Sequence, residues 1–381
     1  MFSILIFLVR IFQIGDLQKY DEKPVMADSI NELRKNYWMV RKLGSGGFGT
    51  VYLIRHRDSN ECFAAKRQPW HDSSVQSFVR KEVSVLKKLV NPEKKHVVQF
   101  INLFEGDKQS IILTEFLEGD ELFRCISSPK YNLTQTKCRT FARQILNAIE
   151  FIHSRGIIHL DLKPENIVLK KNIDPNMESS INQEQLKIID FGLARELRGK
   201  NQIPINLCGT IEYISPEVMR CTYASFASDM WSLGCILYMM VTGGLSPFWA
   251  GNDSRTQRLI LRGTFANGGF DHKCFKQVPM DAIDCISHLL VTNTQSRYTT
   301  SDCLKHKWLV SDFVDTFENV VTVALRKYLA RRRWQKWFLT IKAINRITQL
   351  GLLGSFNKDN DNGNNIEYMS HDPSQLNETW V

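Results

Sequence analysis

Several features that define other protein classes are missing from this 381-residue sequence. Its nine cysteines form no CxxC pair and no regular framework, which argues against a metal site or disulfide scaffold and for reduced thiols in the cytosol. The apolar start, residues 1–14, is shorter than a membrane-spanning helix of about 20 residues and lacks the basic n-region of a secretory signal. A membrane-touching helix, a helix packed on the domain and a start-site artefact all stay open, so 1–36 is an N-terminal extension of unknown role.

Acidic residues are absent between Ala324 and Leu350, where eight basic residues supply most of the chain's formal net charge of +9. These basic residues are Arg326, Lys327, Arg331, Arg332, Arg333, Lys336, Lys342 and Arg346. Large apolar residues such as Trp334 and Phe338 stand between them, as in a basic amphipathic helix. That pattern is typical of calmodulin targets and of helices that lie on a membrane surface.

The first part of the chain is rich in strand patterns. Short β-type runs broken by glycine and polar turns predict strands at 37–43, 50–56, 61–66, 96–103 and 110–116. One helix interrupts them at 74–89, where apolar residues recur at helical spacing.

From about residue 121 helical patterns dominate. One predicted helix begins after Thr134 as a cap and ends at Gly156, and a second, almost wholly apolar helix occupies 225–244. The polar stretch 170–185 is interpreted as a surface loop. Residues 351–381, rich in Asn and Asp, are interpreted as a disordered polar tail.

Five motifs occur in a fixed order along these two parts. The first is a glycine-rich turn that fits G-x-G-x-x-G-x-V, where glycine lets the backbone close over phosphate groups. With the preceding leucine, its residues are Leu43, Gly44, Ser45, Gly46, Gly47, Phe48, Gly49, Thr50 and Val51. The second is Ala64-Ala65-Lys66 at the end of a strand. This lysine needs a carboxylate to hold it, and Glu82 on the following helix is the best candidate.

The other three motifs concentrate charged groups. The run from His159 to Asn166, HLDLKPEN, supplies a base, a cation and a metal ligand within one loop. Asp190-Phe191-Gly192 and then Ser215-Pro216-Glu217 follow it. In this order the five motifs resemble those of the eukaryotic protein kinases, over about Tyr37 to Leu309.

This resemblance implies a fold and a set of roles. The fold would be α+β and bilobal, with a β-rich N-lobe at 37–117, a helical C-lobe at 118–309 and a C-terminal regulatory helix. ATP and Mg²⁺ would bind between the lobes. The catalytic residues would be Asp161, which accepts the substrate proton, and Lys163, which supplies a stabilising charge. Asn166 and Asp190 would bind the metal, and Lys66 would anchor the nucleotide phosphates.

Further positions match family roles. Glu115 and Leu117 resemble the hinge that takes the adenine edge, and Glu121 would reach the ribose or a basic substrate residue. Glu217 would pair with a later arginine, Arg297, and Asp229 would brace the catalytic loop from the apolar helix. We interpret these last contacts as structural.

Two departures from the family pattern concern regulation. Leu160 stands where the family has an arginine before the catalytic aspartate, and residues 193–209 contain no Ser, Thr or Tyr. A phosphate on the activation loop would therefore lack both an acceptor and its usual partner. We expect a kinase that does not depend on activation-loop phosphorylation.

The expected substrates carry basic residues. Glu121 and Glu165 occupy positions that in related kinases face basic residues near the target Ser or Thr. Lys163 within DLKPEN is typical of the serine/threonine branch. Together these residues predict a basophilic Ser/Thr kinase.

Several runs, including HLDLKPENI and DMWSLGCILY, resemble the myosin light chain kinase group. The resemblance implies myosin regulatory light chain as substrate, and an autoinhibitory, calmodulin-binding segment at 310–350 that Ca²⁺/calmodulin releases from the substrate groove. Its calmodulin anchors would be Trp334, Phe338, Ile341 and Ile347. Packing as ordinary structure and contact with an anionic membrane stay open for this helix, while no nucleic-acid partner is expected.

The final residues, Thr379 to Val381, fit the T-x-V ending of a PDZ ligand, although chance also produces such endings. We expect a cytoplasmic enzyme associated with the cytoskeleton. An enzyme of the death-associated or multifunctional calmodulin-kinase type is an alternative, and a non-catalytic calmodulin-binding scaffold is another.

Overall fold

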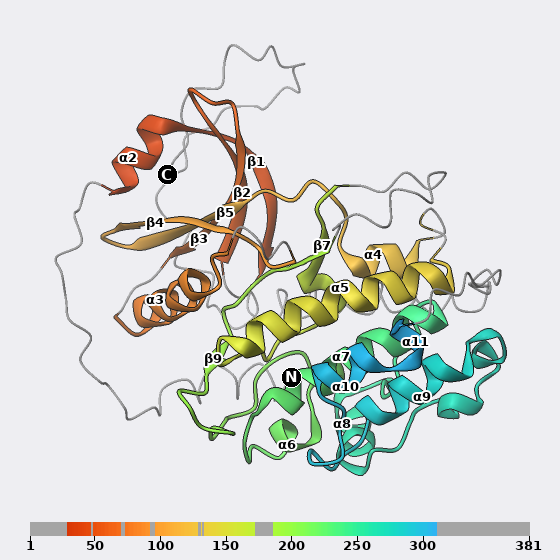
Figure 1. Cartoon of the computed structure of the whole chain (residues 1–381). Helices are drawn as coiled ribbons and strands as arrows, with labels where there is room; N and C mark the ends of the chain where they lie inside the picture. Colours follow the sequence, from red (N-terminus) through yellow and green to blue (C-terminus); the bar gives the residue numbers. More distant parts are fainter. Residues whose placement is uncertain are drawn as a thin grey trace, which may run out of the picture.

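The computed structural model describes residues 29–46, 49–69, 73–91, 96–128, 131, 133–171 and 186–310. These residues form two lobes, a small one built on a sheet and a larger one built mainly of helices (Figure 1). The predicted bilobal α+β architecture, with a β-rich small lobe and a helical large lobe, is confirmed for these residues.

The small lobe is built on an antiparallel five-stranded sheet with the strand order β1-β2-β3-β5-β4. Its elements are α2 (Ser29–Asn36), β1 (Tyr37–Gly46), β2 (Gly49–His56), β3 (Cys62–Pro69), α3 (Ser73–Lys88), β4 (Phe100–Gly106) and β5 (Gln109–Glu115). Strand β5 lies between β3 and β4, and Lys66 of β3 is in register with Ile112 of β5. The sheet therefore carries the lysine on a central strand rather than at an edge.

The two faces of this sheet have different partners. Alternate residues of a strand point to opposite faces, and Leu113 belongs to a core with Leu33 of α2, whereas Ile112 belongs to the core shared with α3 and the large lobe. Val79 and Val83 of α3 are buried in that second core, as the predicted helical spacing requires. One face is thus closed by α2 and the other by α3.

Helix α2 is not among the predicted elements. Its Leu33 is fully buried, and Ser29 Oγ both donates to Glu105 O and accepts from Glu105 N, each at 2.6 Å. The sequence Ser29-x-x-Glu32 has the form of a capping box and was the available signal. Helix α2 therefore packs on the small lobe and contributes Ile30 and Leu33 to its core.

The strand predicted at 96–103 begins later, at Phe100. The preceding residues pair with the large lobe instead, since Val98 N donates to Ile188 O at 3.0 Å and Ile188 N donates to His96 O at 2.9 Å. This stretch therefore ties the two lobes together rather than extending the sheet.

The large lobe begins after the hinge at residues 116–121. Its elements are α4 (Leu122–Ser127), α5 (Gln135–Ser154), β6 (Ile157–Ile158), η2 (Pro164–Asn166), β7 (Ile167–Leu169), β8 (Leu186–Ile188), β9 (Arg195–Glu196), η4 (Ile211–Tyr213), α6 (Pro216–Met219), α7 (Phe226–Thr242), α8 (Asp253–Arg262), η5 (Gly269–Asp271), η6 (Lys273–Gln277), α9 (Met280–Leu289), α10 (Thr300–Lys305) and α11 (Lys307–Val310). Short antiparallel pairs, β7 with β8 and β6 with β9, carry the loops that face the small lobe.

Two long helices support these loops, and both match their predicted spans. Helix α5 begins after Thr134, whose side chain accepts a hydrogen bond from Lys137 N, which satisfies one of the free N–H groups at the helix start. Helix α7 is buried along nearly its whole length and ends at Gly243, whose φ of 70° is a left-handed conformation that glycine adopts without a side-chain penalty.

Some predicted segments lie outside the described residues. They are the apolar start at 1–14, most of the loop at 170–185, the regulatory segment beyond Val310 and the tail at 351–381. Within the ranges that the structure describes, no helix is both long enough and apolar enough to cross a membrane.

Candidate active site

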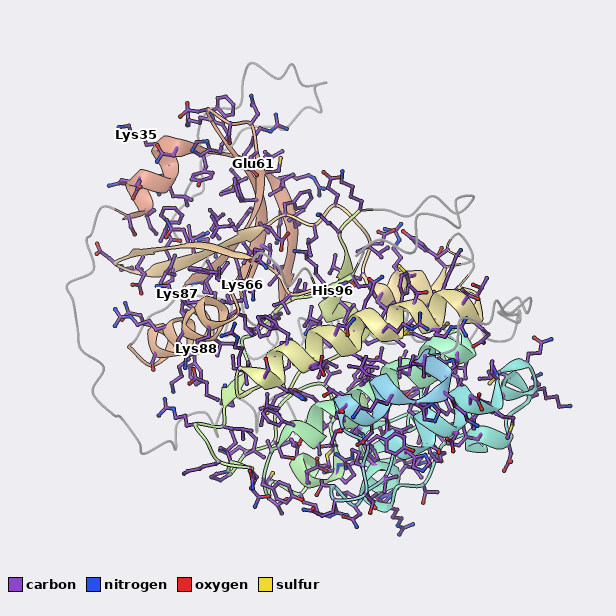
Figure 2. The ribbon with its side chains drawn as sticks, in the orientation of Figure 1. Lys35, Glu61, Lys66, Lys87, Lys88 and His96 are labelled. Carbon is purple, nitrogen blue, oxygen red and sulfur yellow. The ribbon has the colours of Figure 1, made fainter. Side chains whose placement is uncertain are left out.

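A lysine and two carboxylates meet where the small lobe faces the large lobe. Lys66 Nζ lies 2.7 Å from Glu82 Oε1 of α3 and 2.9 Å from Asp190 Oδ1 of the large lobe. Figure 2 shows Lys66 on the side of the sheet next to α3. The predicted pairing of Lys66 with Glu82 is confirmed, and Asp190 joins that pair from the other lobe.

Burial and charge act differently on these three groups. Burial raises the pKa of Glu82 more than Lys66 lowers it. Burial alone would also raise the pKa of Asp190, but the charge and hydrogen bond of Lys66, the nearby His159 and the N–H of Gly192 together outweigh burial and hold that pKa below its ordinary value. Burial would lower the pKa of Lys66, and the two carboxylates reverse that effect and raise it. The mutual attraction of Lys66 and Asp190 therefore favours the charged form of each.

A second cluster surrounds Asp161 on the loop between β6 and η2. Lys163 Nζ lies 2.6 Å from Asp161 Oδ2, and Asn166 Nδ2 donates to the same oxygen at 3.1 Å and to Asp161 O at 2.9 Å. Thr210 Oγ1 donates to the other carboxylate oxygen at 3.2 Å and accepts from Lys163 Nζ at 3.2 Å. The buried carboxylate of Asp161 is thereby held by three side chains.

Thr210 is the member of this cluster that the sequence motifs miss. It follows Gly209, whose φ is 92° and where a Cβ atom would lie 2.8 Å from Leu160 O. Only a residue without a side chain fits this close approach of two loops. No motif in the sequence marks Thr210, because its place beside Asp161 depends on this approach of two distant loops.

Asp229 of α7 forms hydrogen bonds to the main chain of the loop that carries Asp161. Asp229 accepts hydrogen bonds from His159 N at 2.9 Å and from Leu160 N at 3.0 Å. Leu160 has a φ of 66°, a strained conformation for a branched residue, and these two bonds help to hold it. The predicted bracing of the loop by Asp229 is confirmed.

The glycine-rich motif spans the end of β1 and the start of β2. Leu43, Gly44, Ser45 and Gly46 end β1, and Gly49, Thr50 and Val51 begin β2, while Gly47 and Phe48 lie outside the described residues. Gly49 has a φ of 118°, and a Cβ atom there would lie 2.2 Å from Arg67 O. The close pairing of this turn with β3 therefore requires glycine.

The chain is similar to known proteins that carry the same set of motifs. Residues 37–309 match the family model that describes a protein kinase domain. The chain belongs to the protein kinase family. The kinase is 33% identical over 340 residues to the smooth muscle myosin light chain kinase of Gallus gallus. The aligned region covers 89% of this chain and 17% of that protein. It is 36% identical over 313 residues to myosin light chain kinase 3 of Danio rerio, covering 81% of this chain and 41% of that one.

Solved structures agree with these relatives. The autoinhibited serine kinase domain of the giant muscle protein titin superimposes with a TM-score of 0.67 at 28% identity, over 78% of this chain and 88% of that chain. The twitchin kinase fragment of C. elegans gives a TM-score of 0.68 at 28% identity, over 80% and 64% of the two chains. These matches place the kinase in the serine/threonine branch. The chain spans less than half of the length of the curated relatives named above.

The hinge of this kinase uses the side chain of Glu115 for support. Its carboxylate accepts from Gln99 N at 2.7 Å and lies 2.5 Å from Lys187 Nζ of β8. The main-chain N–H of Glu115 is also engaged, since it donates to Gln99 O at 3.0 Å. Glu121 precedes α4 and its main chain bridges to Val168 of β7.

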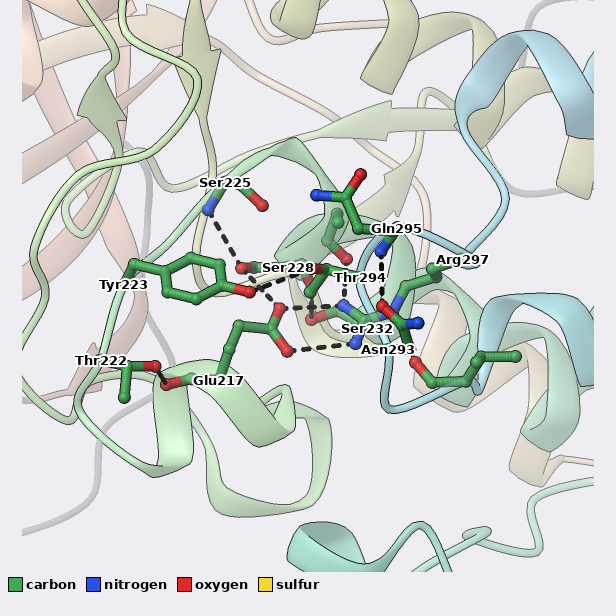
Figure 3. A network of polar contacts seen from close by, with 12 residues as sticks. Glu217, Thr222, Tyr223, Ser225, Ser228, Ser232, Asn293, Thr294, Gln295 and Arg297 are labelled. Carbon is green, nitrogen blue, oxygen red and sulfur yellow. Dashed lines mark hydrogen bonds and ion pairs between the residues drawn. The ribbon is translucent and has the colours of Figure 1, made fainter.

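Arg297 and Glu217 form a buried ion pair that connects two segments of the large lobe. Arg297 Nη1 lies 2.9 Å from Glu217 Oε1 and Nη2 lies 3.1 Å from Oε2, and Ser228 Oγ donates to Oε1 at 2.9 Å (Figure 3). The predicted pairing of Glu217 with Arg297 is confirmed. Burial would raise the pKa of Glu217, but its hydrogen bonds and the charge of Arg297 prevail and lower it.

The residues proposed to bind metal fit a magnesium site. Asn166 uses its amide nitrogen on Asp161, which leaves the amide oxygen for a cation, and Asp190 keeps a charged carboxylate at neutral pH. Mg²⁺ is commonly bound by one or two such oxygen groups together with substrate phosphates. The described residues contain no cluster of three His, Cys, Asp or Glu side chains that would hold a metal without such phosphates.

Proposed function

We propose that this chain is a protein serine/threonine kinase that uses ATP and is activated by Ca²⁺/calmodulin. The proposal is supported by two groups of side chains: Lys66 held by Glu82 and Asp190, and Asp161 held by Lys163 and its neighbours. Phosphoryl transfer depends on positioning and charge neutralisation more than on covalent chemistry, and these groups supply both.

Each group has a distinct role in this mechanism. Asp161 accepts the proton of the substrate hydroxyl, and Lys163, shared between Asp161 and Thr210, stabilises charge on the transferring group. Lys66 anchors the nucleotide phosphates while Glu82 keeps it in place. Asn166 and Asp190 would hold Mg²⁺, which supplies charge neutralisation on the phosphates.

The nucleotide itself would lie between the lobes. The glycine-rich turn, from Leu43 to Val51, would cover its phosphates, and the main chain of Glu115 and Leu117 would take the adenine edge. Glu121, at the start of α4, would take the ribose or a basic substrate residue.

The substrate is proposed to carry basic residues near its target Ser or Thr. Glu121 and Glu165 lie on α4's N-terminal cap and on η2, two elements that contact each other. Their carboxylates would pair with substrate Arg or Lys. Myosin regulatory light chain is the proposed substrate, and the names of the relatives, which are myosin light chain kinases, support this proposal.

Regulation is proposed to reside in the segment 310–350. A basic amphipathic helix with the anchors Trp334, Phe338, Ile341 and Ile347 would bind calmodulin, whose Met-rich grooves accept large apolar side chains. Autoinhibition by the same segment is supported by the likeness to titin kinase, a structure described as autoinhibited. A PDZ contact at Thr379 to Val381 and a cytoskeletal location are further parts of the proposal.

The experiment is phosphorylation of purified myosin light chain by the purified full chain, with and without Ca²⁺/calmodulin. We expect strong stimulation, and we expect Asp161→Asn to lower kcat by roughly 10²- to 10⁴-fold, the usual contribution of a catalytic base. Asp58→Asn, on an exposed turn between β2 and β3, is the control and should change nothing.

The other outcomes separate the alternatives. Equal activity with and without calmodulin would leave a kinase and remove the regulatory helix. Phosphorylation of other basic peptides but not of the light chain would favour a death-associated or multifunctional calmodulin-kinase type. If Asp161→Asn retained every cellular effect, the chain would act as a non-catalytic calmodulin-binding scaffold.

A further inference from the structure

The last turn of α3 is joined to the activation segment by an ion pair. Lys88 Nζ lies 2.6 Å from Glu196 Oε2 of β9, with the two side chains 50% and 20% exposed. Elsewhere on α3, Gln76 and Arg80 both reach Glu105 of β4 within the small lobe. The contact of Lys88 therefore crosses from one lobe to the other, from the end of α3 labelled in Figure 2.

Glu196 is held in place by the main-chain hydrogen bonds of β9. Successive residues of a strand point to opposite sides, so Glu196 faces α3 while Arg195 turns its guanidinium to the carbonyls of Leu193 and Ala194 at 3.1 and 2.9 Å. Strand β9 pairs with β6, and Leu197 N donates to Gly156 O at 2.8 Å. Because β6 leads directly into the loop of Asp161, Glu196 is anchored to the catalytic loop.

The same segment lacks the parts needed for control by phosphorylation. Residues 193–209 contain no Ser, Thr or Tyr, and Leu160 replaces the arginine that would bind a phosphate. In many kinases a phosphate orders this segment by pairing with arginine. In this chain the carboxylate of Glu196 provides a permanent negative charge in the activation segment, and Lys88 of α3 provides the cation that pairs with it.

We propose that the Lys88–Glu196 ion pair is a built-in positioning contact that takes the place of activation-segment phosphorylation. It holds α3 against the large lobe so that Glu82 stays on Lys66. Glu82 and Lys88 are six residues apart, about 9 Å along one rigid helix, so a displacement at one end reaches the other. This inference rests on the proposed kinase function, because its consequence is the placement of Lys66.

The test exchanges the two charges in the full, calmodulin-activated chain. Lys88→Glu and Glu196→Lys should each lower kcat/KM for ATP about fivefold, the upper range for a partly exposed ion pair. The double variant should recover most of the loss. Lys87→Glu is the matched control, since Lys87 is the exposed neighbour on the same turn and lies over the Phe100 ring instead.

Salt and folding measurements exclude a merely structural effect. The loss in the single variants should shrink in 1 M salt, where the screening length is about 3 Å, and their Tm should equal that of Lys87→Glu. Single variants that behave like Lys87→Glu would overturn the inference. A double variant that fails to recover activity would also overturn it.

A readout that needs no activity keeps this inference separate from the proposed function. Amide hydrogen exchange at residues 195–197 should be faster in Lys88→Glu than in the wild type, and unchanged in Lys87→Glu. Equal exchange in all three proteins would overturn the inference even if the chain is an active kinase. Absence of phosphorylation by the wild type would instead count against the proposed function.

Discussion

Two buried ion-pair groups in this kinase differ in how completely their charges are satisfied. In the large lobe one arginine meets one carboxylate through two parallel hydrogen bonds, and Arg297 also donates to Ala227 O and Val291 O. In the cleft one lysine is shared by two carboxylates that come from different lobes, Glu82 and Asp190. The first group is closed, whereas the second keeps an excess of negative charge.

This difference separates a stabilising contact from a functional one. The Glu217–Arg297 pair has no charge left for a ligand, and removal of either partner leaves the other buried and unpaired. The cleft group can bind cations and phosphates because its charges are unbalanced until a ligand arrives. A perturbed pKa marks both places, so the balance of charge, not the shift itself, distinguishes them.

The largest expected effect is on stability, in the closed pair. Arg297→Met should lower the free energy of unfolding by about 3–5 kcal/mol, because Glu217 would be left buried without its partner. Chemical denaturation measures this change, and the phosphorylation rate per folded molecule should be nearly unaffected. Arg258→Met, an exposed position on α8, is the control and should stay within about 0.5 kcal/mol.

A double variant tests the cause of that loss. Glu217→Met combined with Arg297→Met removes both charges and should recover part of the stability, because no buried group then lacks a partner. A loss in the double variant equal to the sum of two single losses would mean that packing, not charge, holds this site together.

The next effect should appear in catalysis with a smaller change in stability. Lys66→Met should lower kcat/KM for ATP by about 10²- to 10³-fold, the usual cost of removing one group that stabilises transition-state charge. Its effect on unfolding should be smaller than that of Arg297→Met, because burial already raises the pKa of Glu82 and the carboxylate can take up a proton. Lys81→Met, an exposed position on α3, is the control.

That prediction would fail if Lys66→Met unfolded the protein as strongly as Arg297→Met. The cleft group would then be another closed structural pair, and the distinction between the two regions would disappear.

The sequence allows much of this fold to be predicted because its signals are local. Thr134 before α5 and Gly243 after α7 mark helix ends by chemistry that acts within a turn. The pairing of Lys66 with Glu82 was also predictable, since both residues belong to motifs in a fixed order. Burial of α7 followed from its nearly continuous apolar character.

What the sequence leaves unpredicted depends on contacts between distant segments. Thr210 joins Asp161 because two loops approach closely at Gly209, and no spacing in the chain encodes that approach. Residues 96–98 have strand character, but their partner is Ile188 of the other lobe. Lys88 and Glu196 look like ordinary surface charges until the fold brings them together.

The smallest expected effect is a difference in pH dependence between the two groups. The pKa of Glu217 is lowered in the folded chain, so its charge contributes stability above the ordinary value of 4.5 that is lost as the pH falls. Burial raises the pKa of Glu82, so the stability linked to its proton is present below pH 4.5 and is lost as the pH rises.

The unfolding free energy of the wild type minus that of Glu217→Gln should therefore increase with pH near 4, and the same difference for Glu82→Gln should decrease above pH 4.5. Each slope is at most about 1.4 kcal/mol per pH unit. Denaturant titrations from pH 3.5 to 7 measure both slopes, and slopes of the same sign would show that folding shifts the pKa values of the two carboxyl groups in the same direction.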